Sequence, residues 1–168
     1  MKSIFKLLFA AFLTVAPLTV SAQSNVAHIN VQQLISEMPE VIAAQNELAK
    51  LEKDYTTQID NAFKEFQTKA QSYSSDAANQ TDVTNQARQT ELESMQTNLQ
   101  EFRDSAAQEL QKKQMDLMTP LLEKARNAIT KVGEEQGFNY VIDSSPNGGI
   151  ILANGKDLLA DVKKELGF

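Results

Sequence analysis

The residue types that perform catalysis or bind metals are scarce in this chain of 168 residues. It has one histidine, His28, and no cysteine, and its carboxylates are spread along polar stretches. A metal site needs clustered His, Cys or carboxylate ligands, and a nucleophilic serine needs a neighbouring base. The serine pairs 74–75 and 144–145 have no such base, and Gly148-Gly149 lacks the strand–loop–helix context of a phosphate loop. We therefore predict no enzyme, no cofactor and no metal, and a structural or surface role for His28.

The dominant feature is a long polar stretch from Pro39 to Gln136, in which apolar residues recur at steps of three and four. Such a narrow stripe, surrounded by Gln, Lys, Glu, Asp and Asn, is typical of a coiled-coil seam. In the first half the stripe contains Val41, Leu48, Leu51, Tyr55, Ile59, Ala62, Phe66 and Tyr73, and in the second half Leu92, Met95, Leu99, Phe102, Ala106, Leu110, Leu117, Leu121, Ala128 and Val132.

The stripe is interrupted between Ser72 and Thr84, where Ser, Asp, Asn and Ala replace the apolar residues. Ser, Asp and Asn compete with helix formation by bonding to their own backbone, so a turn is expected here. Two helices joined by a short polar link fold back antiparallel. The helices would be roughly 55 Å and 80 Å long, whereas a globular domain of this length spans only about 30 to 40 Å. We predict a hairpin arm at 39–120, with its tip near 74–84, that projects from an anchoring body.

The N-terminal residues have the layout of a secretory signal peptide. Lys2 and Lys6 precede an apolar run at 7–15, and the small residues Val20-Ser21-Ala22 follow. A membrane anchor is the weaker alternative, because this run is too short to span about 30 Å of hydrocarbon. We expect residues 1–22 to be removed after Ala22, leaving an exported, periplasmic chain without stable membrane insertion. Losing two lysines and no acid changes the net charge from −6 to −8, which gives no electrostatic footprint for nucleic acid.

The body is predicted to comprise 23–38 and 121–168. A strand at 26–31 is followed by one or two helical turns at 32–38, and Pro39 suits the first turn of the next helix. After Gly137 we predict a strand at 138–142, a hairpin turn at 144–148 and a returning strand at 149–153. Asp157 caps a final short helix with the apolar face Leu158, Leu159, Val162 and Leu166.

The second arm helix changes character around Thr119-Pro120. Beyond this point its stripe widens by Met118, Leu122, Ala125 and Ile129, so that its proximal half should also pack on the body. A proline inside a helix loses one hydrogen bond and costs about 3 kcal/mol. Either the helix kinks at Pro120, or a second helix starts with Thr119 as its N-cap. We favour a kink, because the apolar rhythm continues, and we interpret Pro120 as the arm hinge.

Three short strands cannot close a sheet or cover their own edges. The fold class is therefore α+β and mostly α, with an antiparallel helical-hairpin arm projecting from a small β body that oligomerisation completes. Periodicity alone does not give the number of copies.

The order of these parts resembles the Skp (OmpH-like) family of periplasmic chaperones over essentially the whole mature chain. The residues that carry the resemblance are the first strand ending Ile29-Asn30-Val31, the Gly-Phe-Asn-Tyr-Val-Ile-Asp segment at 137–143, and the closing Asp-Leu-Leu-Ala-Asp-Val segment at 157–162. The long hairpin between the first two is low in complexity and less specific. The order and spacing of the segments carry most of the resemblance.

The resemblance implies a homotrimer in which strands of three chains form one β body and three hairpin arms enclose a cavity. Such proteins hold unfolded outer-membrane β-barrel proteins there without using ATP. The best-known members are strongly basic, whereas this chain is acidic. For that reason binding of acidic lipopolysaccharide is not carried over.

A structural or adaptor coiled coil that spaces or docks other envelope proteins is the alternative function. A spacer should be polar beside the seam, whereas a chaperone needs apolar groups that face its cavity. Leu51, Phe63 and Met115 lie beside the best seam rhythm and are the client-facing candidates. They could equally serve only to widen the contact between the two helices.

Overall fold

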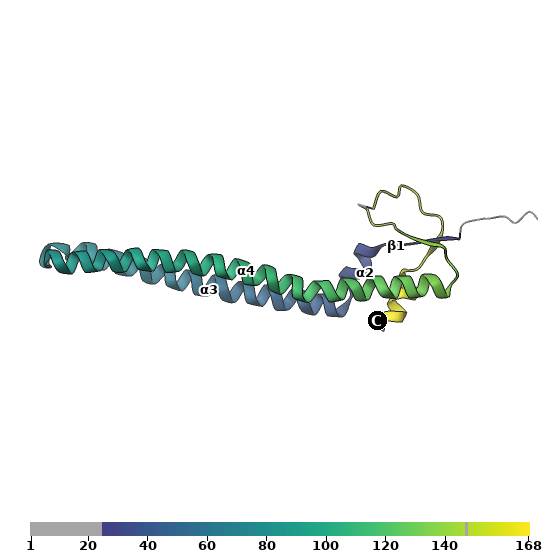
Figure 1. Ribbon diagram of the computed structural model, residues 1–168, viewed down its shortest axis with the longest axis horizontal. Helices are drawn as coiled ribbons and strands as arrows, with labels where there is room; N and C mark the ends of the chain where they lie inside the picture. Colours follow the sequence, from purple (N-terminus) through teal and green to yellow (C-terminus); the bar gives the residue numbers. More distant parts are fainter. Residues whose placement is uncertain (1–24, 147) are drawn as a thin grey trace, which may run out of the picture.

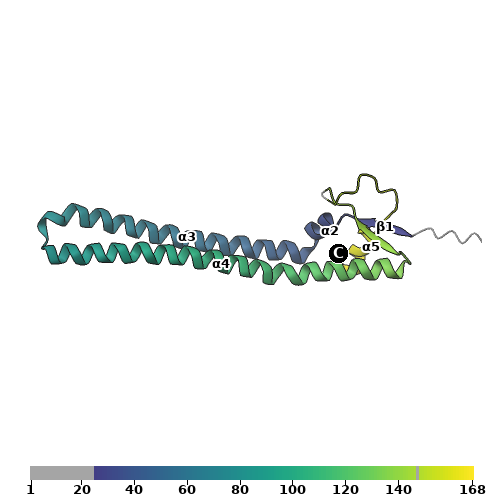
Figure 2. The same ribbon diagram turned by 45° about the horizontal axis from the view of Figure 1, so that its top comes forward.

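The computed structural model describes residues 25–146 and 148–168. It shows a long two-helix arm with a small body at one end (Figures 1 and 2). The elements are β1 (Val26–Ile29), α2 (Val31–Glu37), α3 (Pro39–Asp76), the 3₁₀ helix η1 (Ala77–Asn79), α4 (Asp82–Glu135), β2 (Tyr140–Asp143), β3 (Lys156–Asp157) and α5 (Leu159–Leu166). The predicted fold class, an antiparallel helical hairpin on a small β body, is confirmed. The predicted signal peptide lies outside the described residues.

The arm is built from α3 and α4, which begin and end as their sequences suggest. Pro39 occupies the first turn of α3, where its missing N–H costs nothing, and Asn30 caps the preceding α2 by accepting the Gln33 N–H. At the tip, Thr81 is the N-cap of α4 and accepts the Thr84 N–H. None of the described helices has the run of apolar residues that crossing a membrane requires.

Helix α4 runs without interruption through Pro120. The alternative of a second helix starting at Thr119 is therefore wrong, and the continuous helix that we favoured is present. The kink and the hinge role of Pro120 stay predictions. The division of the chain into arm and body at residues 38 and 121 stays a prediction as well.

The sheet is entirely parallel, with β1 between β2 and β3. Val26 pairs with Tyr140 and Ile29 with Asp143 on one side, while His28 pairs with Asp157 on the other. The predicted hairpin at 144–148 and the returning strand at 149–153 are wrong, because residues 149–153 form no strand. Residues 149–153 leave the outer edge of β2 unpaired, and the chain instead crosses over to pair Lys156–Asp157 with the other side of β1.

The core of the body lies where β1, α2, α4 and α5 meet. Its buried members alternate on β1 and follow the apolar stripes of the helices: Ala27, Ile29, Leu34, Met38, Val41, Ala125, Ala128, Val132, Leu158 and Val162. Met118 and Ile129 pack against it, as the widening of the α4 stripe predicted, and so does Leu121 of the seam, whereas Leu122 is 44% exposed. The N-cap of α5 is Leu158 and not the expected Asp157, which lies one residue earlier, although the Asp157 carboxylate accepts the Leu159 N–H at 2.9 Å.

A polar junction joins the end of β2 to the start of α2. The buried Ser145 hydroxyl donates to Asp143 Oδ1 at 2.6 Å and accepts the Gln32 N–H at 3.0 Å. Asp143 also accepts the Val31 N–H at 3.3 Å. The Ser145 hydrogen bonds hold the pKa of the Asp143 carboxyl below its ordinary value. This junction fixes the first helix of the body against the sheet.

We expect Gly133→Ala to destabilise the body, although alanine is the better helix former by about 1 kcal/mol. A Cβ on Gly133 would lie 2.8 Å from Val141 Cγ2, so α4 and β2 would have to separate. Overpacking of this kind costs about 1 to 3 kcal/mol. Urea unfolding should show a lower midpoint for Gly133→Ala, and Val141→Ala should restore stability in the double variant. A midpoint raised by Gly133→Ala alone would contradict the close approach.

Candidate functional site

Residues 25–146 and 148–168 contain no group of three or more His, Cys, Asp or Glu side chains that could hold a metal. His28 is half-buried on β1, and its Nδ1 lies 3.1 Å from the Ser144 hydroxyl. This contact holds the end of β2 beside β1. The candidate functional site is therefore sought on the surface of the arm and body.

The seam between α3 and α4 is thin along most of the arm. Past Ala44, which is buried near the root of the arm, Leu99 and Ala106 are the buried members among the described residues of the distal seam, and Tyr55 meets Phe102 edge-on with ring centroids 6.0 Å apart. Most other seam residues are only half-buried. The distal arm consequently contains little buried apolar surface.

Polar side chains bridge the two helices along one side of this seam. Lys113 pairs with Glu47 at 2.8 Å, and Lys69 pairs with Glu91 at 2.6 Å. The Tyr55 hydroxyl donates to Glu109, which raises the pKa of Tyr55. The hydrogen bond from Lys69 lowers the pKa of Glu91, with a further contribution from Tyr73. These contacts fix the register of the hairpin where the apolar seam is weak.

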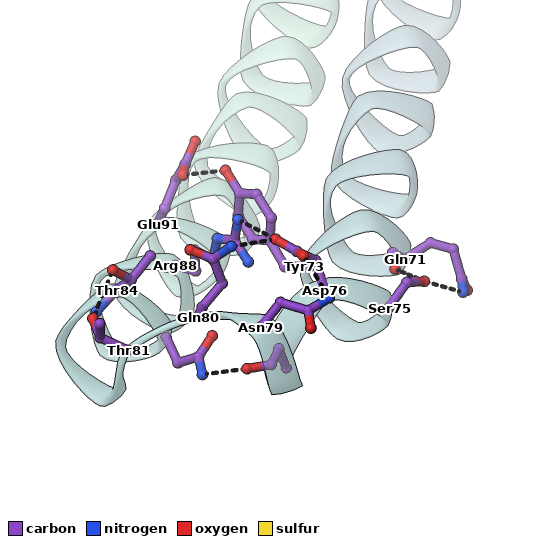
Figure 3. A network of polar contacts seen from close by, with 12 residues as sticks. Gln71, Tyr73, Ser75, Asp76, Asn79, Gln80, Thr81, Thr84, Arg88 and Glu91 are labelled. Atoms are coloured by element: carbon purple, nitrogen blue, oxygen red, sulfur yellow. Dashed lines mark hydrogen bonds and ion pairs between the residues drawn. The ribbon is translucent and has the colours of Figure 1, made fainter.

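The tip is closed by a polar network around Asp76 (Figure 3). Asp76 Oδ2 accepts Gln80 Nε2 at 2.6 Å and Arg88 Nη2 at 3.1 Å. The Arg88 guanidinium also lies 4.7 Å from the centroid of the Tyr73 ring, and Tyr73 donates to Glu91 at 2.6 Å. The Arg88 hydrogen bond is the main reason that the pKa of Asp76 lies below its ordinary value. The network therefore depends on ionised carboxylates.

The hairpin has two flanks with different chemistry. In an α-helix, residues directly before and directly after a seam position lie on opposite sides of the seam. The positions directly before the seam residues are rich in charge and take part in the bridges just described. We name this side the charged face: Glu40, Glu47, Lys50, Asp54, Glu65, Glu91, Glu101, Glu109, Lys112 and Asp116.

The opposite flank consists of the positions directly after the seam residues, counting Ala44, Lys69, Arg88 and Lys113, which also occupy seam positions, and uncharged side chains dominate it. We name it the glutamine face, after Gln45, Gln67, Gln89, Gln96, Gln100, Gln111 and Gln114. Among them lie Ala49, Thr56, Phe63, Ala70 and Ala107, and its charged residues are Glu52, Asp60, Glu93 and Arg103. The charged face has a single glutamine, Gln58. The seam thus separates a mostly uncharged surface from a strongly charged one.

On α4 the glutamine face leads into a groove on the body. Past Met118 the same flank contains Leu122, Ala125 and Ile129, which line a groove of about 690 Å³. Residues of β1, α2 and β2 form its other wall, among them Ile29 and Ile35. Both views of the ribbon place the sheet and α2 on the same side of α4 (Figures 1 and 2). The glutamine face therefore opens toward the side on which the sheet sits.

The structure does not bring the predicted client-facing residues together. Phe63 is 40% exposed on the glutamine face and stacks on Phe66 at 6.5 Å. Leu51 is half-buried in a groove of the charged face beside Lys50 and Asp54. Met115 is 54% exposed at another level of α4. Contact of these residues with a client stays a prediction.

Sequence reasoning missed the glutamine face because it searched for apolar groups beside the seam. The signal was available in the residues that directly follow each seam position. Gln96, Gln100, Gln111 and Gln114 would have appeared there as a stripe parallel to the seam.

The body also exposes apolar side chains at a free sheet edge. Tyr140 on β2 is 62% exposed, and Ile142 is exposed beside it. The irregular segment Ile150–Leu152 is highly exposed, with Ile151 at 102%. An unpaired edge next to an exposed apolar segment is typical of a surface that another chain covers.

Comparisons with known proteins agree with this architecture. Residues 25–166 match the model of the family described as Outer membrane protein (OmpH-like). The chain is 27% identical over 148 residues to the Chaperone protein Skp of Yersinia enterocolitica, covering 85% of this chain and 86% of that protein. It is 20% identical over 151 residues to the Chaperone protein Skp of Pectobacterium atrosepticum, covering 90% of each.

A solved structure shares the fold. It is that of a putative outer membrane chaperone (OmpH-like) from Caulobacter crescentus, with a TM-score of 0.77 and 12% identity. The superposition covers 86% of this chain and 85% of that one. A long helical arm on a small β body is thus also the fold of a protein with a very different sequence.

We expect the tip to loosen in acid. The pKa values of Asp76 and Glu91 are depressed in the folded arm, so their contribution to stability is complete above their ordinary pKa of about 4. That contribution is lost as the pH falls through the lower, folded pKa values. A spin label at Val83→Cys, in a chain without other cysteines, should become more mobile as the pH falls from about 5 to 2.

Two controls separate this effect from general acid unfolding. A label at Asn46→Cys, near the root of the arm, should keep its mobility over the same range. With Asp76→Asn and Glu91→Gln, the Val83 label should already be mobile at neutral pH and change little on acidification. Equal mobility of the Val83 label at all pH values in the parent chain would count against the network.

Proposed function

The chain belongs to the Outer membrane protein (OmpH-like) family, and on that premise we propose that it is a periplasmic holdase chaperone. It would retain unfolded outer-membrane β-barrel proteins between its arms and release them unaltered, without ATP and without any enzymatic step. The names of its relatives, both Chaperone protein Skp, support the chaperone role. The signal-peptide pattern of residues 1–22 supports the periplasmic location.

The observation that carries this proposal is the arm with two unlike faces. The arm helices α3 and α4 have 38 and 54 residues but bury little surface against each other, so the hairpin does not serve mainly to form a hydrophobic core. Its neutral face leads directly into the apolar groove of the body. A spacer would not need this continuity, because it contacts its partners only at its ends.

Retention on such a surface would be the sum of many weak contacts. Phe63 and Met115 each offer an exposed apolar side chain, and burying such a group contributes about 1 to 2 kcal/mol. None of these contacts alone is decisive, so clients of different sequence can be held and released. A thin seam lets the distal arm bend, and therefore clients of different size can be enclosed.

The cavity requires more than one copy, and we propose a homotrimer. Among the residues that the structure describes, the outer edge of β2 has no partner strand, and Ile150, Ile151 and Leu152 are exposed. Pairing between copies would cover both. Three arms rooted in one body would then surround a common space.

Light scattering on the chain without residues 1–22 should give a mass of about three chains at micromolar concentration. Ile151→Asp should shift this mass toward the monomer, since it places a charge in the proposed interface. Thr97→Asp, on the exposed surface of the arm, serves as a charge-changing comparison. A folded monomer of the parent chain at that concentration would exclude the trimer.

Shortening the arm should abolish holding while leaving the oligomer intact. The Glu47–Lys113 ion pair marks residues at one level of the hairpin, so residues 49–111 can be replaced by a Gly-Asn-Gly turn. We expect the product to keep the parent's number of chains and to lose suppression of the aggregation of a urea-unfolded outer-membrane barrel protein. Full suppression by the shortened chain would place the client site on the body. An adaptor function would instead leave the parent chain itself unable to suppress aggregation.

A further inference from the structure

We propose that the glutamine face binds the peptide backbone of an extended, unfolded client segment that lies along the arm. This inference rests on the proposed holdase function and adds the chemistry by which the client is recognised. The occupant is a polypeptide with unpaired N–H and C=O groups, whatever its side chains.

The side chains of this face are available for binding. Gln45, Gln67, Gln96, Gln111 and Gln114 are exposed. Within the part of the chain that the structure describes, their amides form no hydrogen bond to another residue. Only Gln89 and Gln100 are engaged, by Glu93 at 2.9 Å and Asp104 at 3.0 Å. On the charged face, by contrast, acids such as Glu47 and Glu91 are held in bridges across the hairpin.

A glutamine side chain is the chemical match of a peptide group. Its amide offers two N–H donors and one carbonyl acceptor, so it can bond to a backbone C=O and a backbone N–H alike. An unfolded chain displays these groups in every residue. A surface of lysines or glutamates would instead favour clients of one charge. The neutral face therefore binds without choosing by sequence or by net charge.

The spacing of the stripe also suits an extended segment. Gln96 and Gln100 are four residues apart on α4, which places them about 6 Å apart along the helix axis, and Gln100 keeps one amide N–H and its carbonyl besides the N–H that bonds to Asp104. Two residues of an extended chain advance about 6.6 Å. Alternate peptide units of a client lying along α4 can thus meet successive glutamines. Elsewhere on the face, Ala107 of α4 and Phe63 of α3 give its side chains uncharged surface to rest on.

The orientation of the glutamine face favours a client held between the arms over a partner that approaches the arms from outside. The glutamine face opens toward the side of the sheet and continues past Met118 into the body groove. If copies associate through their sheets, these faces look into the shared cavity and the charged faces look outward. A neighbouring arm is the competing occupant, and it would require the arms to be in contact in the free oligomer.

The first test removes three amides without changing charge. Gln96→Ala, Gln111→Ala and Gln114→Ala are combined in the full chain, since alanine keeps exposed helical positions stable. The matched control combines Asn46→Ala, Asn98→Ala and Gln108→Ala, which are exposed and lie off this face. Binding of a urea-unfolded outer-membrane barrel protein after dilution should weaken about tenfold in the first variant and stay near the parental value in the control. Circular dichroism should show equal helicity in all three proteins.

A second test changes the client. A soluble peptide of alternating leucine and serine should bind the parent chain, and N-methylation of every second peptide bond should weaken its binding about tenfold. The triple glutamine variant should no longer distinguish the two peptides. Spin labels at Gln67→Cys should report distances between arms of the free oligomer that exclude contact.

The outcomes separate the two proposals. If the parent chain holds the barrel protein and the triple glutamine variant holds it equally well, or if the methylated peptide binds equally well, the glutamine face is not the binding surface and the holdase function stands. Contact between the arms at Gln67 in the free oligomer would make the face an interface between copies. A parent chain that holds no client would overturn both proposals.

Discussion

The parallel pairing of β1 with β2 is the constraint on which the rest of the structure depends. Parallel strands cannot be joined by a tight turn, because the chain must return to the end at which it started. A single crossover helix normally makes this connection. Here the connection is the whole arm, which leaves the body after α2 and returns through α4. Closing the short ladder from Val26–Tyr140 to Ile29–Asp143 therefore fixes both roots of the hairpin.

The same constraint explains where the arm is firm and where it is weak. Near the body, α4 packs on β1, α2 and α5, and Gly133 lets it approach Val141 closely. Farther out, α3 and α4 have only each other, and an apolar stripe shared by two helices buries little surface. Polar contacts such as Lys69–Glu91 and Arg88–Asp76 then hold register and tip, and exposed ion pairs contribute little to stability. The free energy needed to separate α3 from α4 locally should consequently fall from the root of the arm to its tip.

The sequence was sufficient for the helices and insufficient for the sheet. A three- and four-residue rhythm on both sides of the tip, from Val41 to Val132, indicates two long helices. Their neighbours act locally: Pro39 fits the first turn of α3 because it lacks an N–H, and Asp157 accepts the Leu159 N–H at the start of α5. The strand at 149–153 failed because a β-prone pattern states a preference for pairing and does not identify a partner. Ser-Ser-Pro-Asn-Gly likewise resembles a hairpin turn, although the next strand, Lys156–Asp157, pairs with β1 and not with β2. Whether a strand runs parallel or antiparallel is decided by distant segments, which no local pattern contains.

The candidate site was hidden for a related reason. Leu51, Phe63 and Met115 share a character, apolar and beside the seam, yet they lie on different sides or levels of the hairpin. Each glutamine, taken alone, is an ordinary surface residue of a helix. The glutamines stand out only when the two flanks of the seam are compared, because the other flank is rich in charge. The structure adds that the body lies on the side of the glutamine face.

In the proposed arrangement the acidic net charge of the chain has a physical role. In the proposed trimer the charged faces, which contain more acids than bases, would lie on the outside of the arms. Like charges repel, so neighbouring arms would be kept apart and the cavity held open, most strongly at low salt. The neutral glutamine face would meanwhile leave the interior without a charge preference. An acidic chaperone of this shape thus need not attract its clients electrostatically, because its charge controls the spacing of the arms while its uncharged amides make the contact.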